Sequence, residues 1–270
     1  MSNALGAIVR ALLVMLLIAT PSLMLPPDPD TAQMTVLVSL FAGLLVLAEY
    51  ATVYPSFIAF RDAAPYNRMR FLAIFTTLFG LCTILQLANA EGTALGAMLS
   101  AFGRATADLF DGPLSPLSGM IAALSPHLGA DLADALVGWA ALWGLACAVL
   151  SVAALAILRW PALGAELNLW INLPLFSPSG GDLTERLRRS AGINLVLGIV
   201  LPFAFPILVS IAAPSLWSTK SGSEQMVVWL VTAWTALPLT CWMRGVACFR
   251  IADAIDESRS ADASEPAPSH

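Results

Sequence analysis

Charged residues and histidines are scarce in this chain of 270 residues. Only 11% of its positions are charged, whereas about a quarter are charged in a typical soluble domain. Two histidines, His127 and His270, are too few for histidine-ligated haem, most histidine metal centres or histidine-based phosphoryl transfer. The sequence also lacks a G-x-S-x-G elbow, an H-E-x-x-H motif and a Walker lysine. We therefore name no catalytic, cofactor-binding or metal-binding residue and expect no cofactor.

Cysteine is also rare, with four residues that all fall within or at the ends of apolar runs. This placement implies no disulfide framework. Cys241 and Cys248 are seven positions apart and could share a helix face, but the absence of neighbouring histidines argues against a metal site. Small buried packing residues are the better interpretation. The formal net charge of -5 gives no support to nucleic-acid binding.

Hydrophobic residues, by contrast, make up 58% of the chain. They gather in six stretches of about twenty residues, which at 1.5 Å per residue can cross a hydrocarbon core of roughly 30 Å. The predicted fold is therefore an all-α, polytopic membrane helix bundle within residues 1–255. We place its spans at residues 5–25, 35–54, 71–90, 135–158, 191–213 and 225–246.

The basic residues orient this bundle, because Lys and Arg are retained in cytoplasmic loops. Only Arg104 and Lys220 fall on one side of the predicted spans, and the other eleven basic residues fall on the opposite side. Both termini are therefore predicted to be cytoplasmic. One alternative is that residues 1 to about 25 form a cleaved signal peptide, which would leave five spans in the same orientation.

Two predicted connections are too long to be simple turns. In the outer loop 91–134, apolar residues recur at helical spacing from Thr93 to Phe110, which predicts a helix lying on the outer leaflet. From Pro113 to Gly129 three prolines mix with apolar residues, so we expect an irregular outer cap, with a re-entrant loop or a lid as alternatives. The inner loop 159–190 is expected to hold an interfacial helix from about Leu163 to Ile171.

The inner loops interleave aromatic residues with arginines, a pattern typical of anchoring at the headgroup level. Asp182 and Glu185 resemble a capping box, so a helix is predicted to start at Leu183 and to continue through the arginines into the fifth span. We take the following residues as candidate contacts for lipid or a partner: Tyr54, Phe57, Phe60, Arg61, Tyr66, Arg68, Arg70, Trp160, Trp170, Arg186, Arg188 and Arg189.

Glu49 is the only acidic residue inside a predicted span. An ionisable group in a membrane needs a partner and is a functional candidate, for example in proton coupling. Arg61, Arg68 and Arg70 lie close in sequence, so a salt bridge that locks the loop to the bundle is the favoured interpretation.

Prolines interrupt the last two spans at Pro202, Pro206 and Pro238, where we expect helix kinks. Adjacent broken helices build substrate sites in several transporters, which makes a small-solute or proton-coupled transporter the alternative function.

The favoured function is a non-enzymatic scaffold or accessory subunit whose cytoplasmic aromatic and arginine loops contact lipid or a larger membrane complex. The expected partners are the lipid bilayer, anionic lipid within it, and a membrane protein or further copies of this chain. Residues 256–270 are rich in Ser, Ala, Asp, Glu and Pro and are predicted to form a disordered cytoplasmic tail. Twelve arginines against one lysine fit a GC-rich coding bias, which suggests a bacterial inner membrane.

Overall fold

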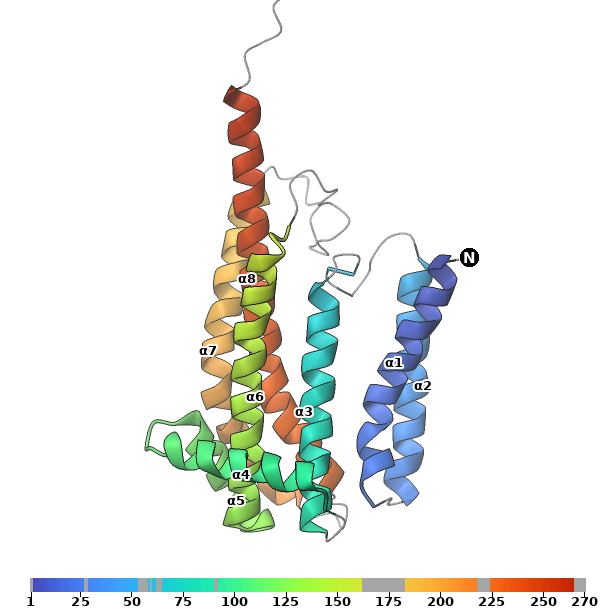
Figure 1. Cartoon of the computed structure of the whole chain (residues 1–270), viewed down its shortest axis with the longest axis vertical. Coiled ribbons are helices and arrows are strands. Elements are labelled where there is room, and N and C mark those ends of the chain that lie inside the picture. Colours follow the sequence, from blue (N-terminus) through green and yellow to red (C-terminus); the bar gives the residue numbers. More distant parts are fainter. Residues whose placement is uncertain are drawn as a thin grey trace, which may run out of the picture.

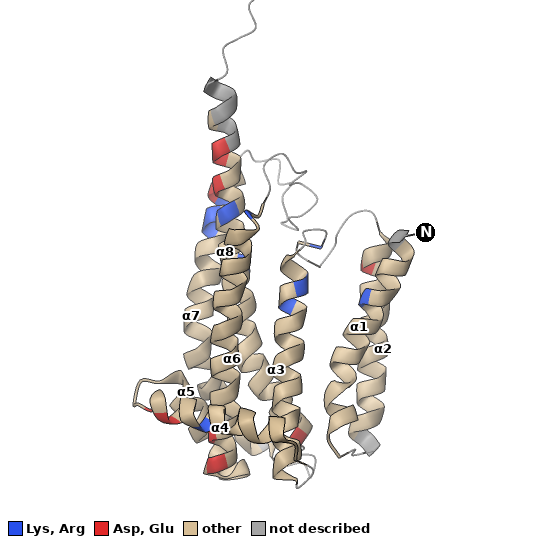
Figure 2. Cartoon of the chain, viewed as in Figure 1, with Lys and Arg blue, Asp and Glu red and all other residues tan. Residues whose placement is uncertain are grey.

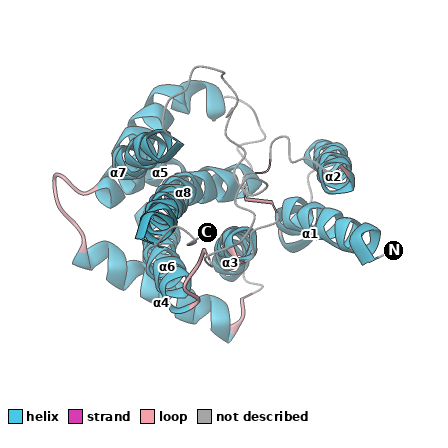
Figure 3. Cartoon of the chain, turned by 90° about the horizontal axis from the view of Figure 1, so that it is seen from above, coloured by secondary structure: helices cyan, strands magenta, loops and turns pink. Residues whose placement is uncertain are grey.

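The computed structural model describes residues 2–26, 29–52, 58, 60–61, 65–89, 92–161, 183–217 and 224–264. Within these ranges every regular element is a helix (Figure 1; Figure 3). In chain order the helices are α1 (Ser2–Met24), α2 (Pro29–Ala51), α3 (Tyr66–Ala88), α4 (Ala94–Leu109), α5 (Pro116–Leu128), α6 (Ala130–Ile157), α7 (Leu183–Leu216) and α8 (Glu224–Ser264).

Six of these helices are long and apolar enough to cross a membrane, namely α1, α2, α3, α6, α7 and α8. This result confirms the all-helical class and the number of apolar spans predicted from the sequence. The helix predicted to run from Leu183 through the arginines into the fifth span is present, since α7 covers Leu183–Leu216 without a break. Its predicted start stays a prediction, because Asp182 lies outside the described residues.

Helix α4 runs across the long helices at one end of the bundle (Figure 1). The side chain of Thr93 caps it by accepting a hydrogen bond from the Gly96 amide at 3.2 Å. Its small residues face α6 so closely that a Cβ at Gly103 or Gly138 would overlap the backbone of the other helix. Its bulky residues Leu95 and Phe102 are exposed. The sequence predicted a helix in this segment. Because its small residues are on one face and its bulky residues on the other, the small-residue face can pack closely against α6.

The segment after α4 differs from the irregular cap that we expected. Residues Pro116–Leu128 form the helix α5, so that expectation is wrong for these residues. Pro116 lies in the first turn, where its missing amide hydrogen costs no helical bond. Leu117, Met120 and Leu124 recur at helical spacing and are buried, so apolar burial holds the short helix against α6 and α7.

Helices α3, α6 and α8 form the centre of the bundle, and α7 packs along α8. The Trp143 indole of α6 donates a hydrogen bond to the Thr76 hydroxyl of α3 at 2.8 Å. Nearby, the Trp139 ring lies over Gly80 of α3, where a Cβ would collide with the indole. Small and polar residues therefore bring the central helices together, as is usual between membrane helices.

The α1–α2 hairpin stands beside α3 (Figure 1; Figure 3). Two hydrogen bonds join the end of α1 to the central helices. The Ser22 hydroxyl donates to the Gln225 side chain of α8 at 3.0 Å, and Gln86 of α3 donates to the Met24 carbonyl at 2.8 Å.

Charged residues separate toward the two ends of the bundle (Figure 2). We call the end that carries Arg68, Arg70, Arg188 and Arg250 the basic end. The opposite end carries Arg104, which pairs with Asp131 at 3.5 Å and so ties α4 to α6.

Helix α8 has 41 residues and extends past the basic end to Ser264. Residues 256–264 are therefore helical, which differs from the disordered tail expected there. Arg188 of α7 explains part of this difference, because it pairs with Asp253 at 2.7 Å and with Asp256 at 3.1 Å. Alanine, glutamate and arginine in this stretch also favour a helix.

Candidate functional site

Three aromatic residues from separate segments meet at the basic end. The Phe60 ring lies 4.7 Å from Tyr66 and 6.1 Å from Trp160, centroid to centroid, and all three side chains are buried. Asn67 of α3 donates a hydrogen bond to the Phe60 carbonyl at 2.8 Å. Phe60 adopts a positive φ of 56°, an uncommon conformation that these contacts hold in place. This aromatic cluster fixes the chain before α3 and the chain after α6 to each other.

Arginine joins α8 to the aromatic cluster. The Nε of Arg250 donates to the Trp160 carbonyl at 2.7 Å. The ends of α3, α6 and α8 are therefore connected through one set of contacts. Of the predicted residues, the structure brings Phe60, Tyr66 and Trp160 together, whereas Tyr54, Phe57 and Trp170 lie outside the described residues.

Glu49 lies in the last turns of α2 and is 1% exposed. Its carboxylate accepts the Ile58 amide hydrogen at 3.2 Å. The Arg61 guanidinium donates to the main-chain carbonyls of Glu49 at 2.6 Å and Thr52 at 2.9 Å. Arginine thus caps the end of α2 through its backbone, and the predicted carboxylate–arginine salt bridge stays a prediction. The loop is nevertheless fastened to α2 at the place that the sequence indicated.

Tyr50 connects this cap to α1. The Arg10 guanidinium carbon lies 4.5 Å from the centre of the Tyr50 ring, and that of Arg61 lies 5.8 Å from it. Such cation–π contacts contribute about 0.5–1 kcal/mol at exposed sites. Tyr50 was not among the predicted residues, although an aromatic residue beside the only intramembrane acid was a signal for it.

The remaining predicted arginines lie on two helices. Arg68 and Arg70 belong to the first turns of α3, and Arg186, Arg188 and Arg189 belong to the first turns of α7. Arg188 is held by the acidic residues of α8, so it acts as a clamp between helices. Arg68 and Arg189 are exposed, as is Arg159 after α6. We call these three exposed arginines at the basic end the basic surface.

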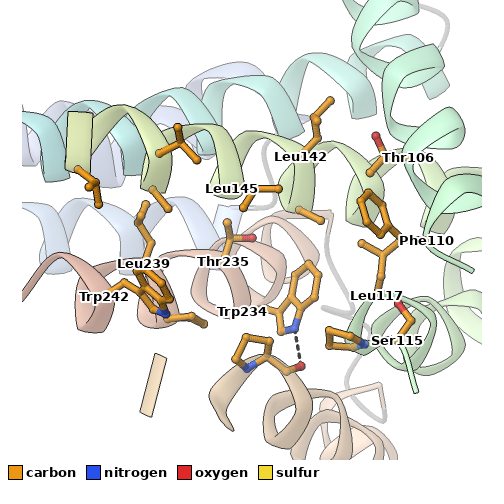
Figure 4. Close-up of a pocket in the computed structure, with 18 of the residues that line it drawn as sticks. Thr106, Phe110, Ser115, Leu117, Leu142, Leu145, Trp234, Thr235, Leu239 and Trp242 are labelled. Atoms are coloured by element: carbon orange, nitrogen blue, oxygen red, sulfur yellow. Dashed lines mark hydrogen bonds between the residues drawn. The ribbon is translucent and has the colours of Figure 1, made fainter. Parts of the chain in front are cut away.

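The prolines predicted to kink the last spans lie inside α7 and α8, and both helices continue through them. Pro202 and Pro238 line an apolar groove of about 800 Å³ (Figure 4). Pro206 contacts a different region, where a Cβ at Gly119 of α5 would lie 3.5 Å from its ring. Sequence reasoning noticed the prolines but missed the groove, because its walls come from helices far apart in the chain.

In the part of the chain that the structure describes, no group of three or more His, Cys, Asp or Glu residues could hold a metal ion. Cys82, Cys147 and Cys248 are buried as free thiols, and Cys241 is partly buried. No protein-family model, curated protein or solved structure matches this chain.

Proposed function

We propose that the protein is a multi-pass membrane protein of a bacterial inner membrane, with both termini and the basic end in the cytoplasm. It serves as a non-enzymatic scaffold or accessory subunit whose basic surface binds anionic lipid of the cytoplasmic leaflet. The observation that carries this proposal is the exposure of Arg68, Arg159 and Arg189 at one end of the bundle. Basic residues at that depth attract an anionic leaflet by about 1 kcal/mol each.

The aromatic cluster supports this proposal through its rigidity. Phe60, Tyr66 and Trp160 connect the ends of α3, α6 and α8, and the ion pairs of Arg188 join α7 to α8. Arg68, Arg159 and Arg189 therefore stand on helix ends that are connected to one another. A preordered basic surface loses less side-chain entropy on binding than one carried by a free loop. A protein partner with an acidic surface would recognise the same arginines and is the competing occupant.

The alternative, a small-solute or proton-coupled transporter, would use the kinked helices α7 and α8. Pro202 and Pro238, which both line the groove, favour a transporter, but the chemical character of the other lining residues does not. Among the groove residues that the structure describes none is charged. A path for polar solutes or protons would need a continuous set of polar groups, and the described lining is mostly aliphatic and aromatic.

The test is lipid selection by the full chain in nanodiscs that mix phosphatidylcholine with phosphatidylglycerol. Replacing Arg68, Arg159 and Arg189 together by Gln should lower the enrichment of phosphatidylglycerol around the protein at least about fivefold, allowing for screening of exposed charges. Arg104→Gln at the opposite end is the control and should leave the enrichment unchanged. Equal enrichment in the wild type and the triple variant would overturn the proposal and favour a protein partner.

A further inference from the structure

The apolar groove opens along the side of the bundle. Helix α8 forms its back, since α6 and α7 each pack against α8, and α5 packs against α6 and α7 near the opposite end. Leu142 and Leu145 of α6 and Trp234 and Leu239 of α8 line this space (Figure 4). The groove is independent of the basic surface described above, which lies at the ends of the helices.

The groove lies at the depth of the bilayer interior. Helix α4 crosses α6 near Gly138, and the 19 residues from there to Ile157 cover about 29 Å, close to one hydrocarbon thickness. Groove residues on α6 run from Ala141 to Ala156, a length of about 22 Å. Phe110 and Leu117 close the end beneath α4 and α5. A ligand would therefore enter sideways, from the lipid.

Two hydroxyl groups that line the groove are bonded within the protein. The Thr235 hydroxyl donates to the Val231 carbonyl at 3.0 Å, and the Thr106 hydroxyl donates to the Phe102 carbonyl at 2.8 Å. Both bonds lie within one helix turn. Apart from the Ser115 hydroxyl and the Trp242 indole nitrogen, the walls therefore present mostly methyl, methylene and ring surfaces, which suit a hydrocarbon chain.

The polar atom of Trp234 is likewise bonded within the protein, and its bond joins α8 to α7. Its indole nitrogen donates to the Pro202 carbonyl of α7 at 3.0 Å (Figure 4). In a regular helix that carbonyl would accept the amide hydrogen of residue 206, but Pro206 has none. The indole thus replaces a missing helical bond and links the two helices that form one side of the groove.

The groove has room for about 800 Å³ and is open along the side of the bundle. A single hydrocarbon chain is narrow enough to enter, and it is the component of a bilayer that surrounds this depth. From size, depth and lining together, we propose that the groove binds one acyl chain of a membrane phospholipid.

Native mass spectrometry of the full chain, purified in mild detergent, tests this proposal. The wild type should retain a phospholipid after the surrounding lipids have been stripped. Leu145→Trp places a larger ring in the groove and should lower that retention roughly tenfold, which corresponds to 1.4 kcal/mol. Leu150→Trp is the matched control, because Leu150 lies on the same helix outside the groove and the two leucines are 59% and 60% exposed. Circular dichroism checks that both variants fold.

Equal retention by Leu145→Trp and Leu150→Trp would overturn the proposal. So would a bound molecule that is not a phospholipid, or a dimer that forms when lipid is removed, which would make the groove an interface between copies. The acyl-chain proposal predicts retention of phosphatidylcholine and phosphatidylglycerol alike. A loss of headgroup preference in the triple arginine variant would therefore not contradict the acyl-chain proposal.

Discussion

Helices α2 and α3 are equally long and contain equally apolar stretches, yet they occupy different positions in the bundle. Half of the most apolar stretch of α3 is buried within the protein, against 11% in α2. The difference follows from small and polar residues: α3 presents Gly80 and Thr76 to α6, whereas α2 exposes Phe41 and Leu44. Hydropathy thus identifies a membrane-spanning helix, and small or hydrogen-bonding residues decide whether it lies in the centre.

The largest difference in stability between α2 and α3 is expected when one leucine is removed from each helix. Leu81 of α3 is fully buried, so Leu81→Ala should lower the free energy of unfolding by about 2–5 kcal/mol through the cavity it leaves. Leu44 of α2 is 64% exposed, and Leu44→Ala should change stability by no more than about 0.5 kcal/mol. Unfolding of the purified protein in mixed micelles measures both values. Similar losses would show that α2 is packed against a second molecule.

A smaller effect is expected from adding one methyl group to a glycine in each helix. Gly80→Ala should destabilise the protein by about 1–3 kcal/mol, because the new Cβ meets the Trp139 ring inside the bundle. Gly43→Ala meets Cγ and Sδ of the flexible Met15 side chain, which can turn away, and lies at an ordinary contact distance of 3.7 Å from the Ala11 carbonyl. Alanine also gains up to about 1 kcal/mol in helix propensity. Thermal unfolding by circular dichroism compares the two variants. A stable Gly80→Ala protein would contradict the close α3–α6 contact.

The smallest effect concerns the hydrogen bond between α3 and α6. Thr76→Val removes the acceptor of the Trp143 indole and should cost about 0.6 kcal/mol, with an upper value near 1.7 kcal/mol. Thr77→Val is the neighbouring control, since the Thr77 hydroxyl donates only within α3, to the Ala73 carbonyl at 2.8 Å. Ser39 of α2 likewise donates to its own helix, at the Val36 carbonyl. Equal changes at positions 76 and 77 would show that the interhelical bond adds nothing.

The sequence predicted what depends on neighbours in the chain. The apolar stretches indicated six spans, Asp182 and Glu185 indicated a helix that runs into the fifth span, and the spacing after Thr93 indicated α4. Contacts between segments that are distant in the chain could not be predicted from the sequence. The bond from Arg250 to Trp160 joins residues 90 positions apart, and the groove requires α6, α7 and α8 to meet. Neither leaves a local pattern, because several other pairings of equally apolar helices would satisfy the same sequence.

The length of α8 places its two ends in different electrostatic surroundings. At 1.5 Å per residue the helix is about 61 Å long, so it extends about 30 Å beyond a hydrocarbon core when it stands upright. Arg250 then lies near the headgroups, whereas Ser264 lies about 21 Å further along the helix, more than two Debye lengths of about 8 Å. Arg250 therefore responds to the composition of the leaflet, while the far end of the same helix is screened from it. A protein that met that end would encounter the same surface whatever lipid lies below.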